Sequence, residues 1–431
     1  MDMKRSITLI GVVAVLSAWG LEAGQAQALP AGPTAQISAV DVAWTAQGQI
    51  RISWSENTPV ANTIKLNDEI PLGTTSAAGA NELVVDAAAL GHTSNPADAA
   101  SITVTDPEGG SSFSRIFDRY LPDPPVLMSV SPEGRATWSV EAEPPLTAND
   151  PLDLEGTTTY KVTLVEEGAA HTCQNTLLSD STATSGTIPK RAKPYHVHVV
   201  PRNEWGTGEP GQTGPVRISR LTITAPALPQ YGTSVTITGM LVESSLLESS
   251  QPTQCNQIFS PGGGQGVILH ARNTPTKPWY VVTTTTTTSS GKYRFTVKNP
   301  GAREYRVIRR TLQRTMDFVY GTSTPAKLVK ATTRVMSAKF ITPVISFGAK
   351  PQAYLWVDPA GSQRAALQFK NASGAWQGVL YKTLSSGRGL ATFNWNRRGT
   401  TRFRWWVPGS RTTTGLKVDP VYTSSFTLTV K

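Results

Sequence analysis

Two groups of arginines in the last third of the chain are the residues whose type and spacing best suit chemistry. A guanidinium group stays charged and offers five donors in a planar fork that matches phosphate and carboxylate groups. Each group lies near a predicted strand, in which alternate residues point outward, so several guanidiniums can share one face. The two groups therefore predict binding of a polyanion. Their members are Arg303, Arg306, Arg309, Arg310 and Arg314, and Arg397, Arg398, Arg402 and Arg404.

The charge distribution supports this prediction. Residues 29–218 carry 11 Lys and Arg against 22 Asp and Glu, a net charge of −11. Residues 219–431 carry 27 against 6, a net charge of +21. Such asymmetry informs about partners rather than about the fold. Three explanations stay open: an anionic polymer binds the basic half, the acidic half of another copy binds it head to tail, or the charges only keep the protein soluble.

Aromatic residues near the C-terminus alternate along predicted strands. In the stretch 402–407, Phe403, Trp405 and Val407 share the side that we assign to the core. The opposite side combines arginine with tryptophan, which suits stacking on sugars or anionic groups. Packing alone also accounts for these aromatics, and we favour that alternative. The candidates for carbohydrate stacking are Tyr354, Trp356 and Trp406.

Other chemistry has weaker support in the sequence. His196 and His198 share one predicted strand face, which we expect to be solvated, and no third metal ligand is near them. The glycine-rich stretch 261–266 lacks the Lys-Ser or Lys-Thr and the helix of a phosphate loop. No Gly-x-Ser-x-Gly or His-Glu-x-x-His motif occurs. We therefore expect a protein that is not an enzyme and that uses no metal and no cofactor.

The composition favours short strands joined by turns. The chain has 431 residues, with 36 Gly, 31 Pro and 16% charged residues. The stretch 195–208 reads as a buried strand, with Tyr195, Val197 and Val199 on one face, followed by a turn rich in Gly and Asn. This stretch resembles the sixth strand and the following turn of a fibronectin type III module. A more diverged module of the same kind precedes it.

The second half contains an internal repeat. Leu269 matches Leu367 at an offset of 98 residues, and Trp279 matches Trp376 at an offset of 97. A period of this length with many short strands indicates tandem β-sandwiches. The pattern is similar to Ig-like repeats of exported bacterial proteins. Within it, residues 283–288 are six threonines, which predict an exposed sheet face or, alternatively, a polar ladder that binds a ligand.

The combined prediction is an all-β fold with four tandem Ig-like or fibronectin type III-like β-sandwich domains after a signal peptide. The signal peptide has a basic start, an apolar core too short for a membrane span, and small residues at the cleavage site. We therefore expect export and no transmembrane segment in the mature chain. The predicted segments are 1–28 for the signal peptide, 29–125 and 126–218 for the fibronectin type III-like domains, and 219–325 and 326–431 for the Ig-like repeats.

Cys173 and Cys255 are the two cysteines of the chain. An exported protein meets an oxidising setting, in which an even number of cysteines favours pairing. A disulfide between them would join the second predicted domain to the third. Two separate free thiols remain the alternative.

The function that we predict is a secreted, non-catalytic binding, adhesion or scaffold protein associated non-covalently with the cell envelope. Its basic half would engage an anionic cell-wall or extracellular polymer, or a protein partner. The alternatives are a carbohydrate-binding accessory protein that uses the aromatics of its last domain, and an exported hydrolase whose site the sequence does not reveal.

Overall fold

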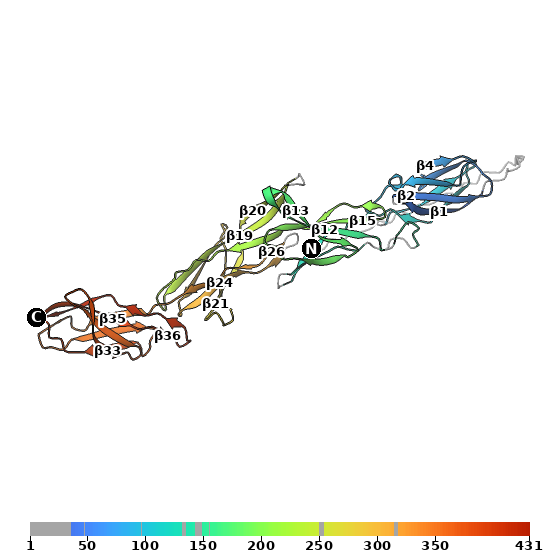
Figure 1. Ribbon diagram of the computed structural model, residues 1–431. Coiled ribbons are helices and arrows are strands. Elements are labelled where there is room, and N and C mark those ends of the chain that lie inside the picture. The colour runs from blue at the N-terminus through green and yellow to red at the C-terminus, as the bar shows by residue number, and fades with distance from the viewer. Residues whose placement is uncertain are drawn as a thin grey trace, which may run out of the picture. The chain divides into compact units, whose positions relative to one another are not determined.

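A computed structural model describes residues 36–46, 48–95, 97–131, 135–142, 149–154, 156–249, 254–313 and 318–431. The predicted signal peptide and Arg314 lie outside these residues. Within them, the helices are α1 (Ala87–Leu90) and the 3₁₀ turn η1 (Ala169–His171), and strands build everything else that is regular. This confirms the predicted all-β fold of packed sheets (Figure 1). None of the helices in the described part of the chain has the length and apolar character of a membrane span.

The chain divides into two compact units. Among the described residues, the first unit comprises 36–91, 97–119 and 149–153. It is a sandwich in which Ile52 and Trp54 of one sheet, and Ile64 and Leu66 of the other, are buried. One sheet contains β1 (Ile37–Ala46), β2 (Gln49–Glu56) and β5 (Glu82–Asp86), the other contains β3 (Asn62–Leu66), β4 (Ile70–Thr75), β7 (Ile102–Thr105) and β8 (Ser111–Phe113), and β6 (Ala99–Ala100) pairs with β9 (Phe117–Asp118).

The second unit begins with another sandwich. Its core packs Trp138 of one sheet against Tyr160 and Tyr195 of the other, and Tyr195 lies on the strand that the sequence predicted to be buried. Gly186 lies beside the indole, and a Cβ there would come within 2.6 Å of Trp138 Nε1. One sheet contains β10 (Leu127–Val130), β11 (Ala136–Ser139) and β14 (Ser185–Ile188), and the other contains β12 (Thr159–Glu167), β13 (Cys173–Ser181), β15 (Tyr195–Asn203), β16 (Gly206–Thr207) and β17 (Gly211–Gln212).

The third sandwich follows within the same unit. Its core joins Ile237 and Phe295 to Leu269 and Val307 of the facing sheet. Residues 283–286 of the threonine run form the end of the edge strand β22 (Tyr280–Thr286), and the run is largely exposed. The strands are β18 (Val216–Leu221), β19 (Ser234–Glu248), β20 (Cys255–Pro261), β21 (Gly266–Arg272), β22 (Tyr280–Thr286), β23 (Lys292–Lys298), β24 (Arg303–Arg309), β25 (Leu312–Gln313), β26 (Phe318–Tyr320), β27 (Thr322–Ser323) and β28 (Lys327–Val329).

The fourth sandwich repeats the arrangement of the third. Leu367 is buried in its core as Leu269 is in the third, and Phe403 takes the place of Tyr305. One sheet contains β29 (Arg334–Phe340), β31 (Gln352–Asp358) and β34 (Arg388–Thr392), the other contains β30 (Val344–Ile345), β32 (Arg364–Lys370), β33 (Trp376–Thr383), β35 (Gly399–Val407), β38 (Val421–Tyr422) and β39 (Phe426–Val430), and β36 (Ser410–Arg411) pairs with β37 (Lys417–Val418).

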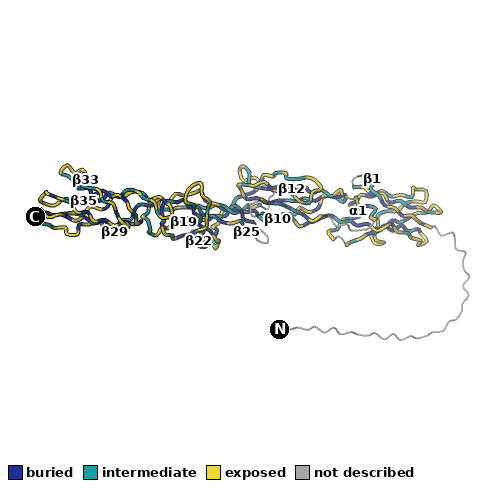
Figure 2. The backbone as a smooth tube through the Cα atoms, turned by 90° about the horizontal axis from the view of Figure 1, so that it is seen from below, coloured by how far each residue is buried: buried dark blue, intermediate teal, exposed yellow. Residues whose placement is uncertain are grey.

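Burial alternates from residue to residue along strands such as β21 and β24, and Figure 2 shows buried and exposed residues interspersed along the described chain. On β35, Phe403, Trp405 and Val407 are fully buried, which confirms the side of this strand that we assigned to the core. Trp406 points the other way and is half-buried. The period-two pattern in the sequence therefore identifies the core side of this strand correctly.

Strand β18 connects the second and third sandwiches through hydrogen bonds. It pairs with β19, and in parallel with β26. Its residue Val216 also pairs with Tyr195 of β15. The hydroxyl groups of Tyr195 and Tyr320, whose strands both pair with β18, lie 3.1 Å apart. Residues 120–431 thus form one compact unit apart from 149–153, and the predicted boundaries at 125, 218 and 325 remain predictions.

A disulfide also joins the two sandwiches. It links Cys173, at the start of β13, to Cys255, at the start of β20. Beside it, Thr172 and Gln254 form an antiparallel bridge. The hairpin of β19 and β20 is therefore held against the second sandwich both covalently and by backbone hydrogen bonds.

The same hairpin corrects the expected exposure of the histidines on β15. His196 is only 7% exposed, and its ring nitrogens lie 3.3 and 3.4 Å from the carbonyl oxygens of Thr213 and Leu246. The Nε2 atom of His198 lies 3.4 Å from Glu248 Oε1. The expectation of a solvated face is wrong for His196, because a hairpin from the third sandwich covers this side of the sheet.

Replacing Trp138 with Ala should lower the free energy of unfolding by about 3–5 kcal/mol, because the side chain is only 2% exposed and leaves a large cavity. The matched control is Leu177→Ala on β13, where the side chain is 59% exposed and the loss should stay below about 0.5 kcal/mol. Chemical unfolding of the full chain measures both changes. Equal losses in the two variants would contradict the assignment of Trp138 to the core.

Replacing Glu248 with Gln should loosen the β19–β20 hairpin at neutral pH by about 0.5–1 kcal/mol. The interaction with His198, whose Nε2 lies 3.4 Å from Glu248 Oε1, lowers the pKa of Glu248 below its usual 4.5. The pair therefore stabilises the fold above pH 4.5, and this stabilisation is lost as the pH falls through the lowered pKa. Amide hydrogen exchange of the hairpin should separate the two proteins at pH 7 and converge in acid. Glu209→Gln, at an exposed position, should behave like the parent protein at every pH.

Candidate anion-binding site

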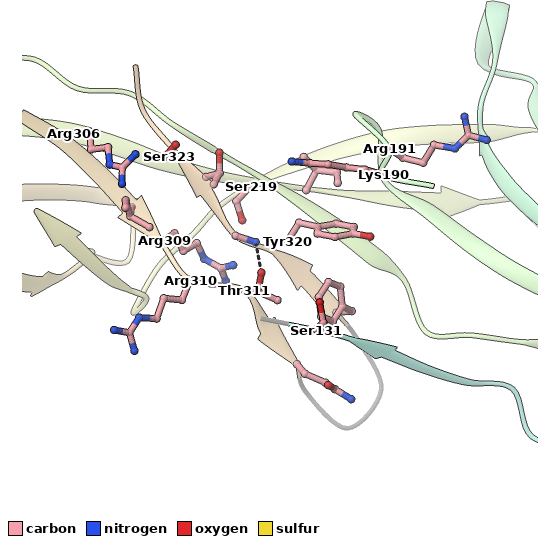
Figure 3. Close-up of a pocket in the computed structure, with 16 residues that line it drawn as sticks. Ser131, Lys190, Arg191, Ser219, Arg306, Arg309, Arg310, Thr311, Tyr320 and Ser323 are labelled. Atoms are coloured by element: carbon pink, nitrogen blue, oxygen red, sulfur yellow. Dashed lines mark hydrogen bonds between the residues drawn. The ribbon is translucent and has the colours of Figure 1, made fainter. Parts of the chain in front are cut away.

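A basic recess of about 1200 Å³ lies between the second and third sandwiches (Figure 3). Lys190 and Arg191 come from the segment between β14 and β15. Arg306 and Arg309 come from β24, and Arg310 follows it. No acidic residue lines the recess among the residues that the structure describes. Five cationic residues from two sandwiches thus line one recess, and Figure 3 shows the guanidiniums of Arg191 and Arg310 pointing away from its centre.

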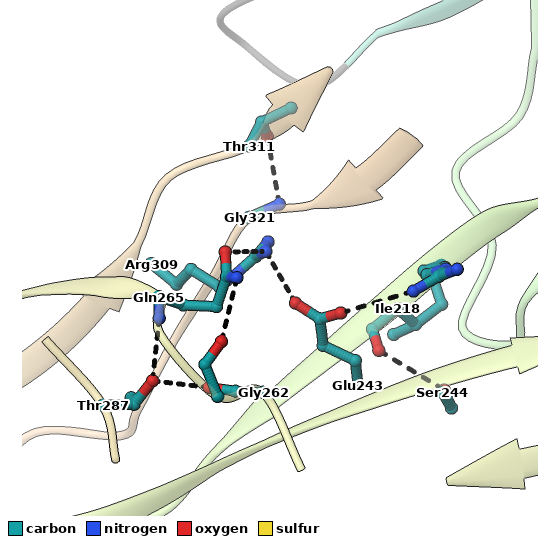
Figure 4. Close-up of polar contacts among 11 residues, drawn as sticks. Ile218, Glu243, Ser244, Gly262, Gln265, Thr287, Arg309, Thr311 and Gly321 are labelled. Atoms are coloured by element: carbon teal, nitrogen blue, oxygen red, sulfur yellow. Dashed lines mark hydrogen bonds and ion pairs between the residues drawn. The ribbon is translucent and has the colours of Figure 1, made fainter. Parts of the chain in front are cut away.

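The floor of the recess contains a buried ion pair. Arg309 is only 3% exposed, and its guanidinium donates a hydrogen bond of 2.7 Å to Glu243 Oε1 (Figure 4). It also donates to Gln265 Oε1 at 3.3 Å. Because the carboxylate of Glu243 offsets this charge, Arg309 shapes the floor and adds little net charge to it.

Ser219 lies beside this ion pair. It stands directly opposite Glu243 in the antiparallel pairing of β18 with β19, so the two side chains share a face. Ser219 lines the recess and is 4% exposed. Its Oγ atom has no hydrogen-bond partner among the described residues. The floor therefore contains a buried hydroxyl group whose hydrogen-bonding capacity is not used by the described residues.

The rim of the recess supplies the net positive charge. Lys190, Arg306 and Arg310 form no ion pair with any residue that the structure describes, whereas Arg191 Nε lies 3.9 Å from a carboxylate oxygen of Glu166. Burial and the neighbouring Arg272 lower the pKa of Arg306 from its usual value. An anion at the rim would relieve both effects, because it favours the charged form of the guanidinium.

His270 stands opposite Arg306 in the pairing of β21 with β24. Burial lowers its pKa, and so do the charges of Arg306 and Arg310. The imidazole is consequently neutral at neutral pH, and the positive charge of this region then comes from lysine and arginine alone.

The first arginine group does not share one face, and this corrects the expectation from the sequence. On β24, Arg303 and Arg309 point into the sandwich and are buried, whereas Arg306 points outward. Arg303 donates hydrogen bonds to the hydroxyl oxygens of Tyr305, at 2.6 Å, and Tyr280, at 3.0 Å. Residues three positions apart lie on opposite sides of a strand. Arg303 and Arg309, six positions apart, therefore share the side that faces the core, and Arg306 lies on the other side.

The second arginine group stacks on aromatic rings. The guanidinium of Arg404 lies 4.2 Å from the ring centre of Trp376 and 3.9 Å from that of Tyr422. Arg404 Nε also donates to Gln368 Oε1 at 2.9 Å. Arg397 stacks on Phe369 and Trp395, Arg398 stacks on Phe347, and Arg402 is exposed. These contacts give part of this group a structural role.

The structure does not bring the carbohydrate-stacking candidates onto one platform. Tyr354 and Trp356 lie on the outer side of β31, and Trp406 lies on the outer side of β35. These strands belong to the two sheets that enclose the core of the fourth sandwich, so their outer sides face in opposite directions. Arg388 also stacks on Trp356, with its guanidinium 4.5 Å from the ring centre.

Sequence reasoning missed three residues of the recess. Lys190, Arg191 and Ser219 lie about a hundred positions before the arginines of β24, and no motif connects them. The internal repeat did indicate one stacking contact that occurs in both sandwiches: Arg306 stacks on Trp279 as Arg404 stacks on Trp376.

The described residues contain no cluster of His, Cys, Asp and Glu suited to hold a metal ion.

No protein-family model matches the chain, and no curated protein matches its sequence. Among solved structures, the FN1–FN3 domains of chicken CNTN1 are similar at 9% identity and a TM-score of 0.25, covering 69% of this chain and 99% of that chain. A structure from a 1.5-MDa bacterial ice-binding adhesin, studied for its host cell surface retention, is similar at 14% identity and a TM-score of 0.18. The match covers 72% of this chain and 99% of the adhesin chain. TM-scores this low carry no inference about a shared ligand.

Replacing Glu243 with Gln should lower the free energy of unfolding of the second unit by about 3–5 kcal/mol, because the Arg309 charge loses its buried partner. Changing Arg309 to Gln as well should recover part of the loss, as a double-mutant cycle by chemical unfolding would show. The control is Glu304→Gln, which removes the more exposed pair with Arg272 and should cost below about 1 kcal/mol. Similar costs in the two single variants would contradict a special role for the buried pair.

Proposed function

We propose that this chain is an exported, non-catalytic binding protein of the cell envelope that engages an anionic polymer with its basic residues 219–431, together with Lys190 and Arg191 of the adjoining sandwich. The observation that carries the proposal is the basic recess, where Lys190, Arg306 and Arg310 face solvent-accessible space without a carboxylate partner among the described residues. Ion pairs with a ligand are most effective in such a partly desolvated concave surface.

The disulfide supports the exported location. Cys173 and Cys255 are bonded to each other, and disulfides persist in oxidising compartments outside the cytosol. The predicted signal peptide is consistent with the same route. The tandem sandwiches also suit a binding or scaffold role, because each can present its loops and outer sheet faces to a partner.

Head-to-tail assembly is the second candidate function. The acidic residues 29–218, with a net charge of −11, complement the basic half of another copy. A head-to-tail contact repeats from copy to copy and leads to an open chain unless its rotation closes a ring. This candidate uses the same basic surface, so it predicts the same salt dependence but a different ligand.

Replacing both Lys190 and Arg310 with Glu should weaken binding of the full chain to immobilised anionic polymers about tenfold or more, because two charge-assisted contacts become repulsive. The matched control is Lys292→Glu with Lys298→Glu, which changes the net charge equally at exposed positions of β23. Binding should be measured from 0.01 M to 1 M salt, where the Debye length falls from about 30 Å to about 3 Å.

Three outcomes separate the candidates. Polymer binding that only the recess variant loses supports the proposed function. Concentration-dependent sedimentation at low salt without polymer binding supports head-to-tail assembly. If the full chain shows neither at 0.01 M salt, the charge asymmetry has no binding role, and a spacer or structural function replaces both.

A further inference from the structure

We propose that the basic recess binds phosphodiester groups of a polyol-phosphate polymer; this inference rests on the proposed function and specifies its ligand. Two lining residues of the recess have polar side-chain atoms without a hydrogen-bond partner in the described part of the chain. Ser219 at the floor and Arg306 at the rim both line the recess, and neither Ser219 Oγ nor Arg306 Nε has a hydrogen-bond partner among the described residues. A ligand oxygen that accepted a hydrogen bond from either group would supply the partner that buried polar groups in native proteins generally have.

The positions of the donors favour a tetrahedral oxyanion. Figure 3 shows Ser219 between Lys190 on one side and the arginines of β24 on the other. A tetrahedral phosphodiester presents its two charged oxygens and its ester oxygens in different directions. A carboxylate has only two oxygens, which lie in one plane with its carbon. Donors that approach from opposite walls and from the floor therefore suit phosphate better.

The remaining surface of the recess suits a polyol rather than a nucleic acid. Phe318 and Tyr320 line it, but both rings are buried and offer no open face on which a base could stack. Proteins that bind single-stranded nucleic acids use such faces. Hydroxyl groups line the recess instead, and these can exchange hydrogen bonds with a hydroxylated chain. They belong to Ser131, Ser219, Thr311, Thr322 and Ser323.

The size of the recess favours a polymer segment over a free ion. Its volume of about 1200 Å³ corresponds to about forty water molecules at about 30 Å³ each. One phosphate ion leaves most of this space to water. A phosphodiester flanked by a polyol unit on each side is long enough to contact the charged rim with its phosphate and the hydroxyl groups of the recess with its polyol units.

The test uses the full chain and a short poly(glycerol phosphate) oligomer, measured by titration calorimetry and by ³¹P line broadening. Oligomers matched in charge provide the comparisons: an oligogalacturonate for carboxylates, a dextran sulfate fragment for sulfates and an oligothymidylate for nucleic acids. We expect the glycerol phosphate oligomer to bind most tightly. Replacing Ser219 with Ala should weaken its binding about tenfold and leave oligogalacturonate binding unchanged. Because Ser219 Oγ has no hydrogen bond to lose, the variant should unfold at the same denaturant concentration as the parent protein.

Two results would overturn this inference while the proposed function stands. One is equal or tighter binding of the carboxylate, sulfate or nucleic acid oligomer. The other is an unchanged affinity of Ser219→Ala for glycerol phosphate while Lys190→Glu with Arg310→Glu loses it. If the parent protein binds none of the four oligomers at 0.01 M salt, both the inference and the proposed function fail.

Discussion

The hydrogen bonding of strand β18 is the constraint on which the basic recess depends. This strand pairs with β15 of the second sandwich through Tyr195 and Val216, and with β19 and β26 of the third. A strand that is paired in this way cannot turn relative to either neighbour without breaking backbone hydrogen bonds in a buried region. The recess is therefore lined by residues from both sandwiches at a fixed separation, which a flexible linker would not provide.

The disulfide and the ion pair act on this junction from two sides. The Cys173–Cys255 bond fixes the end of the β19–β20 hairpin, and this hairpin covers the histidine side of β15. The Arg309–Glu243 pair fills the floor on the recess side. A buried ion pair is weak evidence for stability, because desolvation offsets much of its attraction. The ion pair matters here because it fixes the orientation of Arg309 in the floor of the recess, while the carboxylate of Glu243 keeps the net charge of the floor close to zero.

Some arginines of the basic half are held by contacts within the fold, whereas others lie at the surface. Arg303 and Arg309 are buried with hydrogen-bond partners, and Arg404 is held between two aromatic rings. Stacking of guanidinium groups on aromatic rings stabilises by about 0.5–2 kcal/mol and places the flat side of the ring out of reach of a ligand. The net charge of +21 for residues 219–431 therefore exceeds the number of cationic side chains that have neither an ion-pair nor a stacking partner among the described residues.

The sequence by itself determined the features that depend on local periodicity and composition. Alternation identified the core side of β35 and the shared buried face of Tyr195, Val197 and Val199 on β15, and the repeat placed Leu269 and Leu367 in equivalent cores. These properties follow from the period of a strand, which is set within a few residues. Only the tertiary structure decided the rest. The pairing of β18 brings Lys190 within the same recess as Arg310, 120 positions later, and no local pattern encodes that meeting.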